Sequence, residues 1–138
     1  MKVKTAGLTG AALDWAVAKW CREQVRIYPL GGEDFELLLP SGDRFEPSTN
    51  WADGGPLIER YDLMFERYAP SPQDDGRKFL CYAGGDGRQG TLGIGASHLE
   101  AAMRMVVARG FGEEMEIPDE LGALAEDPAG AAVPAPGM

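Results

Sequence analysis

The feature that most restricts the fold of this chain is one strongly marked helix. Residues 97–100 read Ser-His-Leu-Glu, a capping box in which a serine and a glutamate satisfy the first free amides of a helix. The pattern predicts a helix over residues 97–109 with Gly110 as its C-terminal cap. Its buried stripe is predicted to comprise Leu99, Ala102, Met103 and Val106. A helix with one apolar stripe needs other elements to cover it.

A second helix and several strands are predicted to supply that cover. Residues 9–23 carry apolar side chains at helical spacing behind Thr9, a favourable N-cap residue. Because Trp15 lies off this stripe, the helix is either buried on two sides in its own domain or shared with a partner subunit. Strand patterns occupy three further segments, and a shorter extended piece follows the capped helix: 25–28, 35–39, 79–83 and 115–118. The first two read as a hairpin or meander, and residues 57–61 fit either a strand or a helix.

Composition indicates one domain. The chain has 138 residues, of which 44% are hydrophobic and 25% charged, values typical of a globular protein with a single core. We therefore predict an α+β fold over residues 1–121, with a mostly antiparallel sheet packed against two main helices. Alanine, proline and glycine dominate residues 122–138, which predicts a flexible tail. An exposed loop is predicted over residues 70–76.

The charge balance restricts the partners. Thirteen basic residues stand against 22 acidic ones, a net charge of −9, which argues against general nucleic-acid binding but permits local basic clusters. No apolar run approaches the roughly 20 residues that a membrane span requires, and the first residues lack a signal core. We expect a cytoplasmic protein without membrane contact. Cys21 and Cys81 are expected to be buried structural residues.

The sequence offers few catalytic groups. His98 is the single histidine, so paired-imidazole zinc motifs are excluded, and a histidine base also needs an orienting partner. No nucleophile elbow is present. We expect no catalytic residue, no metal site and no cofactor. The sequence does not support enzymatic activity, and it does not exclude it either.

A tryptophan-containing loop is the first candidate binding element. Residues 47–56 combine hydroxyls with Asn50, Trp51 and Asp53, and their glycines allow close backbone approach. Such a tryptophan can stack on a planar ligand while the amide and carboxylate contact its polar edge. The alternative is a rigid turn whose tryptophan fills the core.

The glycine-rich segment 87–97 is the second candidate, because it leads directly into the capped helix. Free amides at a helix N-terminus bind anions, helped by the helix dipole. Arg88, Thr91 and Ser97 are the residues expected near a phosphate, with Arg60 and Arg104 as secondary candidates. Neither the phosphate-loop nor the dinucleotide-binding spacing is present, so a plain surface connection is the alternative. If the two segments meet, they form a small pocket for stacking and anion contacts.

Three blocks of the chain resemble the NinX-like family of phage proteins. They are residues 3–18, residues 48–60 (STNWADGGPLIER) and residues 101–121, and the second is similar to the family segment ST-[DN]-W-A-x-GGP-[IL]-IE. The resemblance covers residues 1–121, although residues 61–90 depart from it. It implies a small bacteriophage or prophage accessory protein in the host bacterial cytoplasm, from a family of unknown function. It supplies no catalytic residues.

These observations lead to one main hypothesis and two alternatives. The main one is a non-catalytic phage protein that binds a small anionic, nucleotide-like ligand, and so sequesters a host immune nucleotide signal as an inhibitor of anti-phage defence. Because pockets often lie at subunit interfaces, we also expect a homo-oligomer. One alternative is an acidic antagonist of a basic host or phage protein. The other is a small nucleotide hydrolase or lyase that uses Asp14, Asp53 and Glu59.

Overall fold

The computed structural model describes residues 1–32, 34–68 and 79–124. Within these ranges the chain forms a single small α+β domain, as predicted, with three α-helices rather than the two main ones expected. The helices are α1 (Gly10–Cys21), α2 (Trp51–Arg60) and α3 (His98–Phe111), accompanied by the 3₁₀ turns η1 (Thr5–Gly7), η2 (Gly87–Gln89) and η3 (Asp119–Leu124).

The seven strands of the described residues pair in three small antiparallel sheets. The strands are β1 (Lys2–Lys4), β2 (Arg26–Gly31), β3 (Asp34–Leu38), β4 (Leu63–Arg67), β5 (Phe79–Ala83), β6 (Gly93–Gly95) and β7 (Glu114–Glu116). The predicted hairpin is the β2–β3 pair, and the predicted strand at 79–83 is the centre of the β4–β5–β6 sheet. The extended piece near residue 115 pairs with β1.

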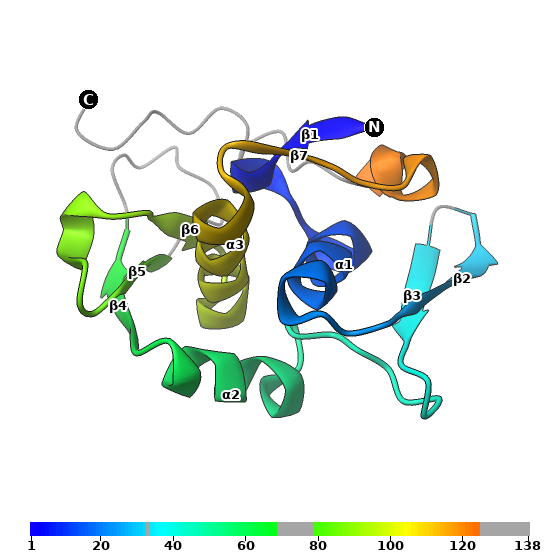
Figure 1. Ribbon diagram of the computed structural model, residues 1–138, viewed down its shortest axis with the longest axis horizontal. Coiled ribbons are helices and arrows are strands. Elements are labelled where there is room, and N and C mark those ends of the chain that lie inside the picture. Colours follow the sequence, from blue (N-terminus) through cyan, green and yellow to red (C-terminus); the bar gives the residue numbers. More distant parts are fainter. Residues whose placement is uncertain (33, 69–78, 125–138) are drawn as a thin grey trace.

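Helix α3 is the centre of the domain (Figure 1). The β4–β5–β6 sheet lies on one side of it, α1 on the other, and α2 runs across their ends. Most of the α3 side chains from Leu99 to Val107 are therefore buried. The approach of β6 is unusually close, because a Cβ at Gly93 would collide with the carbonyl oxygen of Ala101 in the α3 backbone.

Helix α1 is covered on two sides within its own domain. It packs against α3 on one side and against β3 and η3 on others, and Ala12, Leu13, Ala16 and Val17 are completely buried. Trp15 is partly buried against the same core, with the Lys19 ammonium 5.2 Å from the centre of its ring. The burial of α1 on two sides within its own domain, one of the two explanations offered for Trp15, is therefore seen in this fold.

The end of α3 differs from the prediction. The helix continues through Gly110 and ends at Phe111, with Gly112 in the left-handed region at φ 86° as the cap. A Cβ at Gly110 would collide with the ring of Trp20 from α1. Gly110 is thus required for close helix packing, while Gly112 supplies the positive φ that ends the helix.

Other boundaries also shift. Strand β2 continues through Pro29, which an edge strand tolerates because its outer amides need no partner. The segment 57–61 is resolved as helix, since α2 begins at Trp51, inside the predicted loop. η3 extends to Leu124, past the predicted domain end at residue 121. The predicted loop at 70–76 and residues 125–138 of the predicted tail lie outside the described residues.

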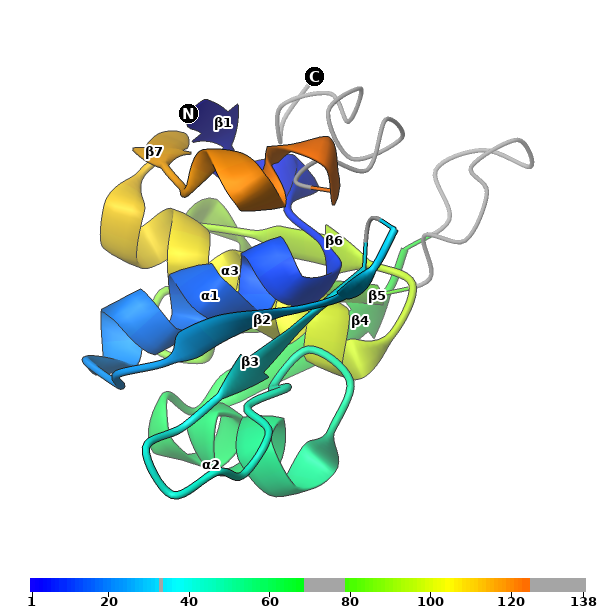
Figure 2. The same cartoon turned by 90° about the vertical axis from the view of Figure 1, so that its right-hand side faces the viewer.

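All three helices begin on the same side of the domain, at the right in Figure 2. Each ends with a basic residue in its last turn, Lys19, Arg60 and Arg109 respectively, which complements the negative end of the helix dipole.

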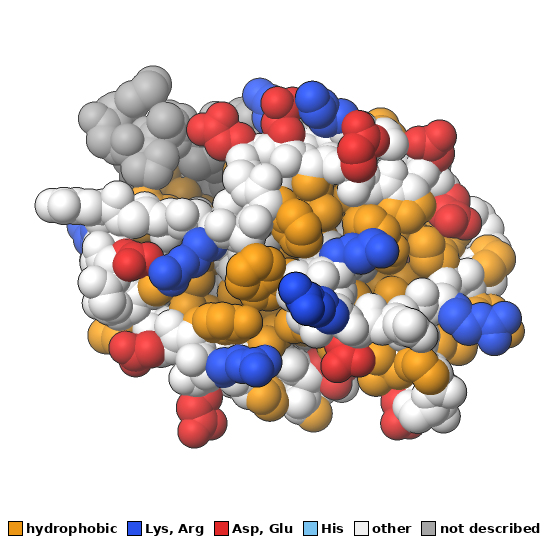
Figure 3. All heavy atoms as spheres, in the orientation of Figure 1, with side chains coloured by type: hydrophobic (Ala, Val, Ile, Leu, Met, Phe, Trp, Pro, Cys, Tyr) orange, Lys and Arg blue, Asp and Glu red, His pale blue; other side chains and the backbone are white. Residues whose placement is uncertain are grey.

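On the face drawn in Figure 3, Lys and Arg side chains lie among hydrophobic ones near the middle, and acidic side chains line much of the outline. The charge of this acidic chain is therefore unevenly distributed.

Candidate functional site

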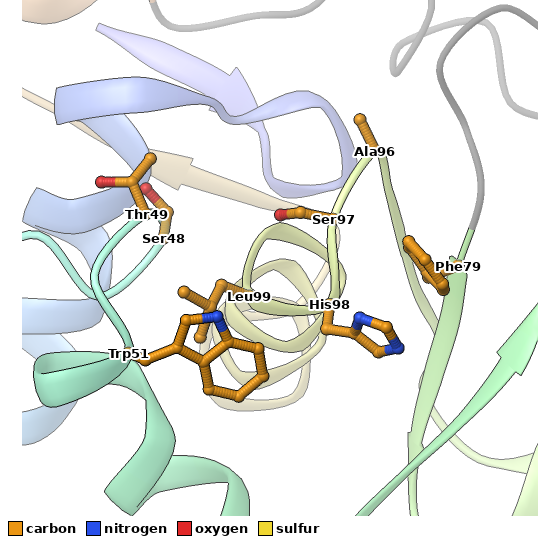
Figure 4. Close-up of a pocket in the computed structure, with 8 residues that line it drawn as sticks. All are labelled: Ser48, Thr49, Trp51, Phe79, Ala96, Ser97, His98 and Leu99. Atoms are coloured by element: carbon orange, nitrogen blue, oxygen red, sulfur yellow. The ribbon is translucent and has the colours of Figure 1, made fainter.

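A pocket of about 420 Å³ lies between the beginnings of α2 and α3 (Figure 4). One wall comes from the segment before α2 and its first residue, the other from the start of α3, and β5 closes one side. The lining residues are Ser48, Thr49, Trp51, Phe79, Ala96, Ser97, His98 and Leu99. We call this the Trp51 pocket. It joins the two segments that were predicted to bind a ligand if they met.

Aromatic rings form much of the surface of the Trp51 pocket. The indole of Trp51 is 58% exposed, and its ring centre lies 6.4 Å from that of His98. The imidazole of His98 in turn lies 3.9 Å from the ring of Phe79 and 5.0 Å from that of Phe65. A large exposed indole beside a fixed imidazole provides a surface on which a planar ring can stack.

Two helix N-termini border this surface. Ser97 Oγ accepts a hydrogen bond from the Glu100 amide at 3.1 Å, and Asn50 Oδ1 accepts one from the Ala52 amide at 2.9 Å. In the part of the chain that the structure describes, the backbone amides of His98 and Leu99 have no acceptor. Unsatisfied amides in the first turn of a helix are suited to bind an anionic group.

The predicted capping box forms only in part: the Ser97 hydroxyl caps the helix, but the Glu100 side chain does not accept from the Ser97 amide. The Glu100 carboxylate accepts from the Ala96 amide at 3.0 Å and from the Thr9 hydroxyl at 3.1 Å, rather than from the amide of Ser97. Thr9 itself makes no side-chain cap to α1. Glu100 therefore ties the beginning of α1 to the beginning of α3.

Three of the eight predicted site residues lie at the pocket. Trp51 and Ser97 line it, and Asn50 caps the helix that Trp51 begins. The Asp53 carboxylate accepts from the Glu46 amide at 2.9 Å, so it holds the preceding segment. Thr91, which precedes β6, does not line the pocket.

The three predicted arginines lie elsewhere. Arg60 is at the far end of α2, 6.0 Å from the ring centre of Tyr61, and Arg88 lies 3.6 Å from a Glu66 carboxylate oxygen. Arg104 is only 1% exposed; its guanidinium donates to the carbonyl oxygens of Leu8 at 2.7 Å and Ile94 at 2.8 Å. The structure thus brings none of these cations to the Trp51 pocket.

Sequence reasoning did not select several lining residues. His98 is weighed from the sequence as a zinc ligand, as a base and as a residue at the start of a helix, but not as part of a binding surface. Phe79 follows a segment with no recognisable pattern, and Ser48 and Thr49 were noted only for their hydroxyls. Nothing local in the sequence indicates that Phe79 lies beside His98.

A second cavity, of about 220 Å³, lies between the first turn of α1, the β2–β3 hairpin and residues 44–49. We call it the Asp14 cavity, because Asp14 is its buried carboxyl, 5% exposed. Arg44 lines it as well and pairs with Glu36 at 3.0 Å. Thr49 belongs to both the Asp14 cavity and the Trp51 pocket, so the two hollows are neighbours.

Burial raises the pKa of Asp14 from 3.8 to about 7, and the charges of Glu46 and Asp53 add to the rise. The hydroxyl and the backbone amide of Ser48 oppose it. The amide donates to Asp14 Oδ1 at 2.8 Å. The hydroxyl acts by proximity, since Ser48 Oγ makes no hydrogen bond of good geometry within the described residues. Asp14 is therefore a carboxyl that changes its charge close to neutral pH.

Two further findings concern the described ranges as a whole. No group of three or more His, Cys, Asp or Glu side chains there is placed to hold a metal ion. None of the helices there combines the length and apolarity needed to cross a bilayer.

Comparison with known proteins identifies a family. The family model described as Bacteriophage P22, NinX matches residues 4–109, which include both walls of the Trp51 pocket. No curated protein matches the chain.

Proposed function

The chain belongs to the family of bacteriophage P22 NinX, and we propose that this phage protein binds a small anionic, nucleotide-like ligand in the Trp51 pocket. One observation carries the proposal: an exposed indole and an imidazole lie beside first-turn amides that have no acceptor in the described chain. The rings suit a base and the amides suit a phosphate. The volume of about 420 Å³ falls in the range of small-molecule sites.

The net charge of −9 does not oppose this proposal at the pocket itself. None of the described lining residues carries a carboxylate. The nearest acidic side chains in the first turns, Asp53 and Glu100, are engaged by donors elsewhere. An approaching anion therefore meets amides and aromatic rings before it meets carboxylates.

Binding without turnover fits the lining residues best. Ser97 Oγ is occupied as a helix cap, and the His98 ring is packed against Phe79 and Phe65. Neither arrangement pairs a nucleophile with an oriented base. In an infected cell, a protein that holds such a ligand unchanged would lower its free concentration. We therefore propose sequestration of a host immune nucleotide signal as the biological role.

The test is a thermal-shift screen against mono-, di- and cyclic nucleotides and ADP-ribose derivatives. A ligand at 100 times its dissociation constant stabilises the fold by about 2.7 kcal/mol. Trp51→Ala should abolish the shift while the protein still folds, because the indole is more than half exposed. Tyr28→Ala, which removes an aromatic ring 46% exposed on β2, should leave the shift unchanged.

Two results would overturn the proposal. One is the absence of any shift across the panel, which would turn the search to a basic protein partner whose binding weakens steeply with salt. The other is a shift that survives in Trp51→Ala. Release of the ligand after denaturation, followed by chromatography, separates sequestration from turnover, because a sequestered ligand is recovered unchanged.

A further inference from the structure

We propose that Asp14 is a positioning residue that links ligand binding in the Trp51 pocket to pH, with the protonated carboxyl as the binding-competent form. This inference rests on the proposed function. It concerns a residue outside the pocket that acts on one of its walls.

The link is a single hydrogen bond between two elements. Asp14 projects from α1, and its Oδ1 accepts from the Ser48 amide at 2.8 Å. Ser48 and Thr49 form the wall of the Trp51 pocket that leads into α2. The carboxyl therefore lies behind this wall, with the Asp14 cavity on its other side.

Ser48 supplies a second observation. Its side chain is 4% exposed, and within the described residues Oγ has no hydrogen-bond partner. An ionised carboxylate only accepts hydrogen bonds, whereas a protonated one also carries a donor. Because the Ser48 hydroxyl can both donate and accept, it can donate to the ionised carboxylate or accept from the protonated one. Titration of Asp14 therefore changes the hydrogen bonding of the wall residue.

The charges around Asp14 determine which form is favoured. Glu46 and Asp53, from the segment before α2 and from its first turn, disfavour the ionised carboxylate. Glu36 and Arg44 line the same cavity but pair with each other. Burial acts in the same direction as the neighbouring carboxylates, and together they place the pKa of Asp14 at about 7.

The direction of the pH effect follows. Above neutral pH a negative charge forms behind the wall. This charge weakens the binding of an anion. We expect affinity to fall roughly fivefold between pH 6 and pH 8, the size of effect that one unit charge exerts across a partly solvated interior.

The experiment uses the full chain and cyclic adenosine monophosphate as probe, because a phosphodiester keeps one charge from pH 6 to pH 8. Affinity is measured across this range for the native chain, Asp14→Asn and His98→Asn. The third protein removes the imidazole that lines the pocket, so it separates any contribution of His98 from that of Asp14. We expect the same fold-change in the native chain and in His98→Asn, although the variant binds more weakly at every pH because it lacks one of the stacking rings. We expect constant affinity in Asp14→Asn.

A readout without ligand keeps the inference separate from the proposed function. The indole N–H signal of Trp51, assigned in the NMR spectrum with Trp51→Phe, is followed in His98→Asn, which removes the neighbouring imidazole. It should shift with a midpoint near pH 7 in this variant and stay fixed when Asp14→Asn is added. If the probe fails to bind while this titration is seen, the ligand assignment fails and the link from Asp14 to the wall stands. A titration that persists in the double variant, or is absent from His98→Asn, overturns the link.

Discussion

At the scale of single residues, Asp14 also controls how stability depends on pH. Its pKa is raised from 3.8 in an unfolded chain to about 7 in the folded one, so the folded state keeps the proton up to a higher pH than the unfolded state does. The stability that this proton confers is complete below about pH 4 and is lost as the pH rises to about 7. The total loss is about 4 kcal/mol, from about 1.4 kcal/mol per pKa unit.

Asp14→Asn should therefore remove this component of the pH dependence. The amide keeps an oxygen that can accept from the Ser48 amide but cannot ionise. Urea unfolding at pH 4, 6 and 8 should show the variant gaining several kcal/mol over the native chain as the pH rises. Glu59→Gln, which changes an exposed carboxyl on α2, is the control and should follow the native profile. Parallel profiles for the native chain and Asp14→Asn would contradict the assignment.

At the scale of elements, the contact between β6 and α3 depends on the missing side chain of Gly93. A Cβ there would collide with the Ala101 carbonyl oxygen and lie 2.5 Å from the Met105 amide nitrogen. Both atoms belong to the backbone of α3, so neither can move unless the whole helix shifts.

Gly93→Ala should accordingly destabilise the domain by about 3 kcal/mol or more, the upper end of the effect of overpacking a core. Gly85→Ala is the matched control, because no heavy atom lies within 4 Å of a Cβ at that position and its φ is not positive. It should change the free energy of unfolding by less than about 0.5 kcal/mol. Denaturant unfolding gives the free energy of unfolding of both variants. If Gly93→Ala lost no more stability than Gly85→Ala, the strand β6 could move away from α3.

At the scale of the whole molecule, Arg104 connects distant parts of the chain. From the middle of α3 its guanidinium donates to Leu8, which precedes α1, and to Ile94 in β6. It also lies 3.5 Å from a Glu100 carboxylate oxygen. One buried cation thus joins the N-terminal segment, the three-stranded sheet and the central helix.

Arg104→Ala should destabilise the fold by about 3–5 kcal/mol, because it removes the donor from the carbonyl oxygens of Leu8 and Ile94 and the buried cation beside Glu100. Arg104→Lys should recover only part of this loss, since an ammonium lacks the planar fork that reaches several acceptors. The control is Arg26→Ala, an exposed arginine on β2. Thermal and urea unfolding should rank the native chain as most stable, Arg104→Lys as intermediate and Arg104→Ala as least stable, with Arg26→Ala close to the native chain. An Arg104→Lys variant as stable as the native chain would show that charge alone suffices.

The sequence predicted α1 and α3 because each carries its own signals, an apolar stripe and an N-cap residue. It did not predict that α2 begins at Trp51, because Gly54, Gly55 and Pro56 are poor helix formers. Gly54 is needed there, since a Cβ would collide with the carbonyl oxygen of Pro47 and lie 2.7 Å from Leu99 Cδ2. Tertiary packing overrides local preference at this point.

The candidate site was predictable in its parts and not in its assembly. Trp51 and Ser97 were recognisable as binding residues from their neighbours in the chain. Their proximity depends on how α2 packs against α3, which no local pattern specifies. The charge of Arg104 predicted an accessible residue near a phosphate. In the structure the side chain is buried, and its guanidinium donates to the carbonyl oxygens of Leu8 and Ile94. No local pattern in the sequence indicates these partners.

The pairing of β1 with β7 has a consequence for synthesis on the ribosome. Lys4 pairs with Glu114, so these partners leave the ribosome about 110 residues apart. At about 5–20 residues per second, the first strand waits roughly 5–20 s for its partner. Throughout that delay the apolar face of α1 also lacks α3, the helix that covers it. The domain therefore reaches its native state only after the residues of β7 have left the ribosome.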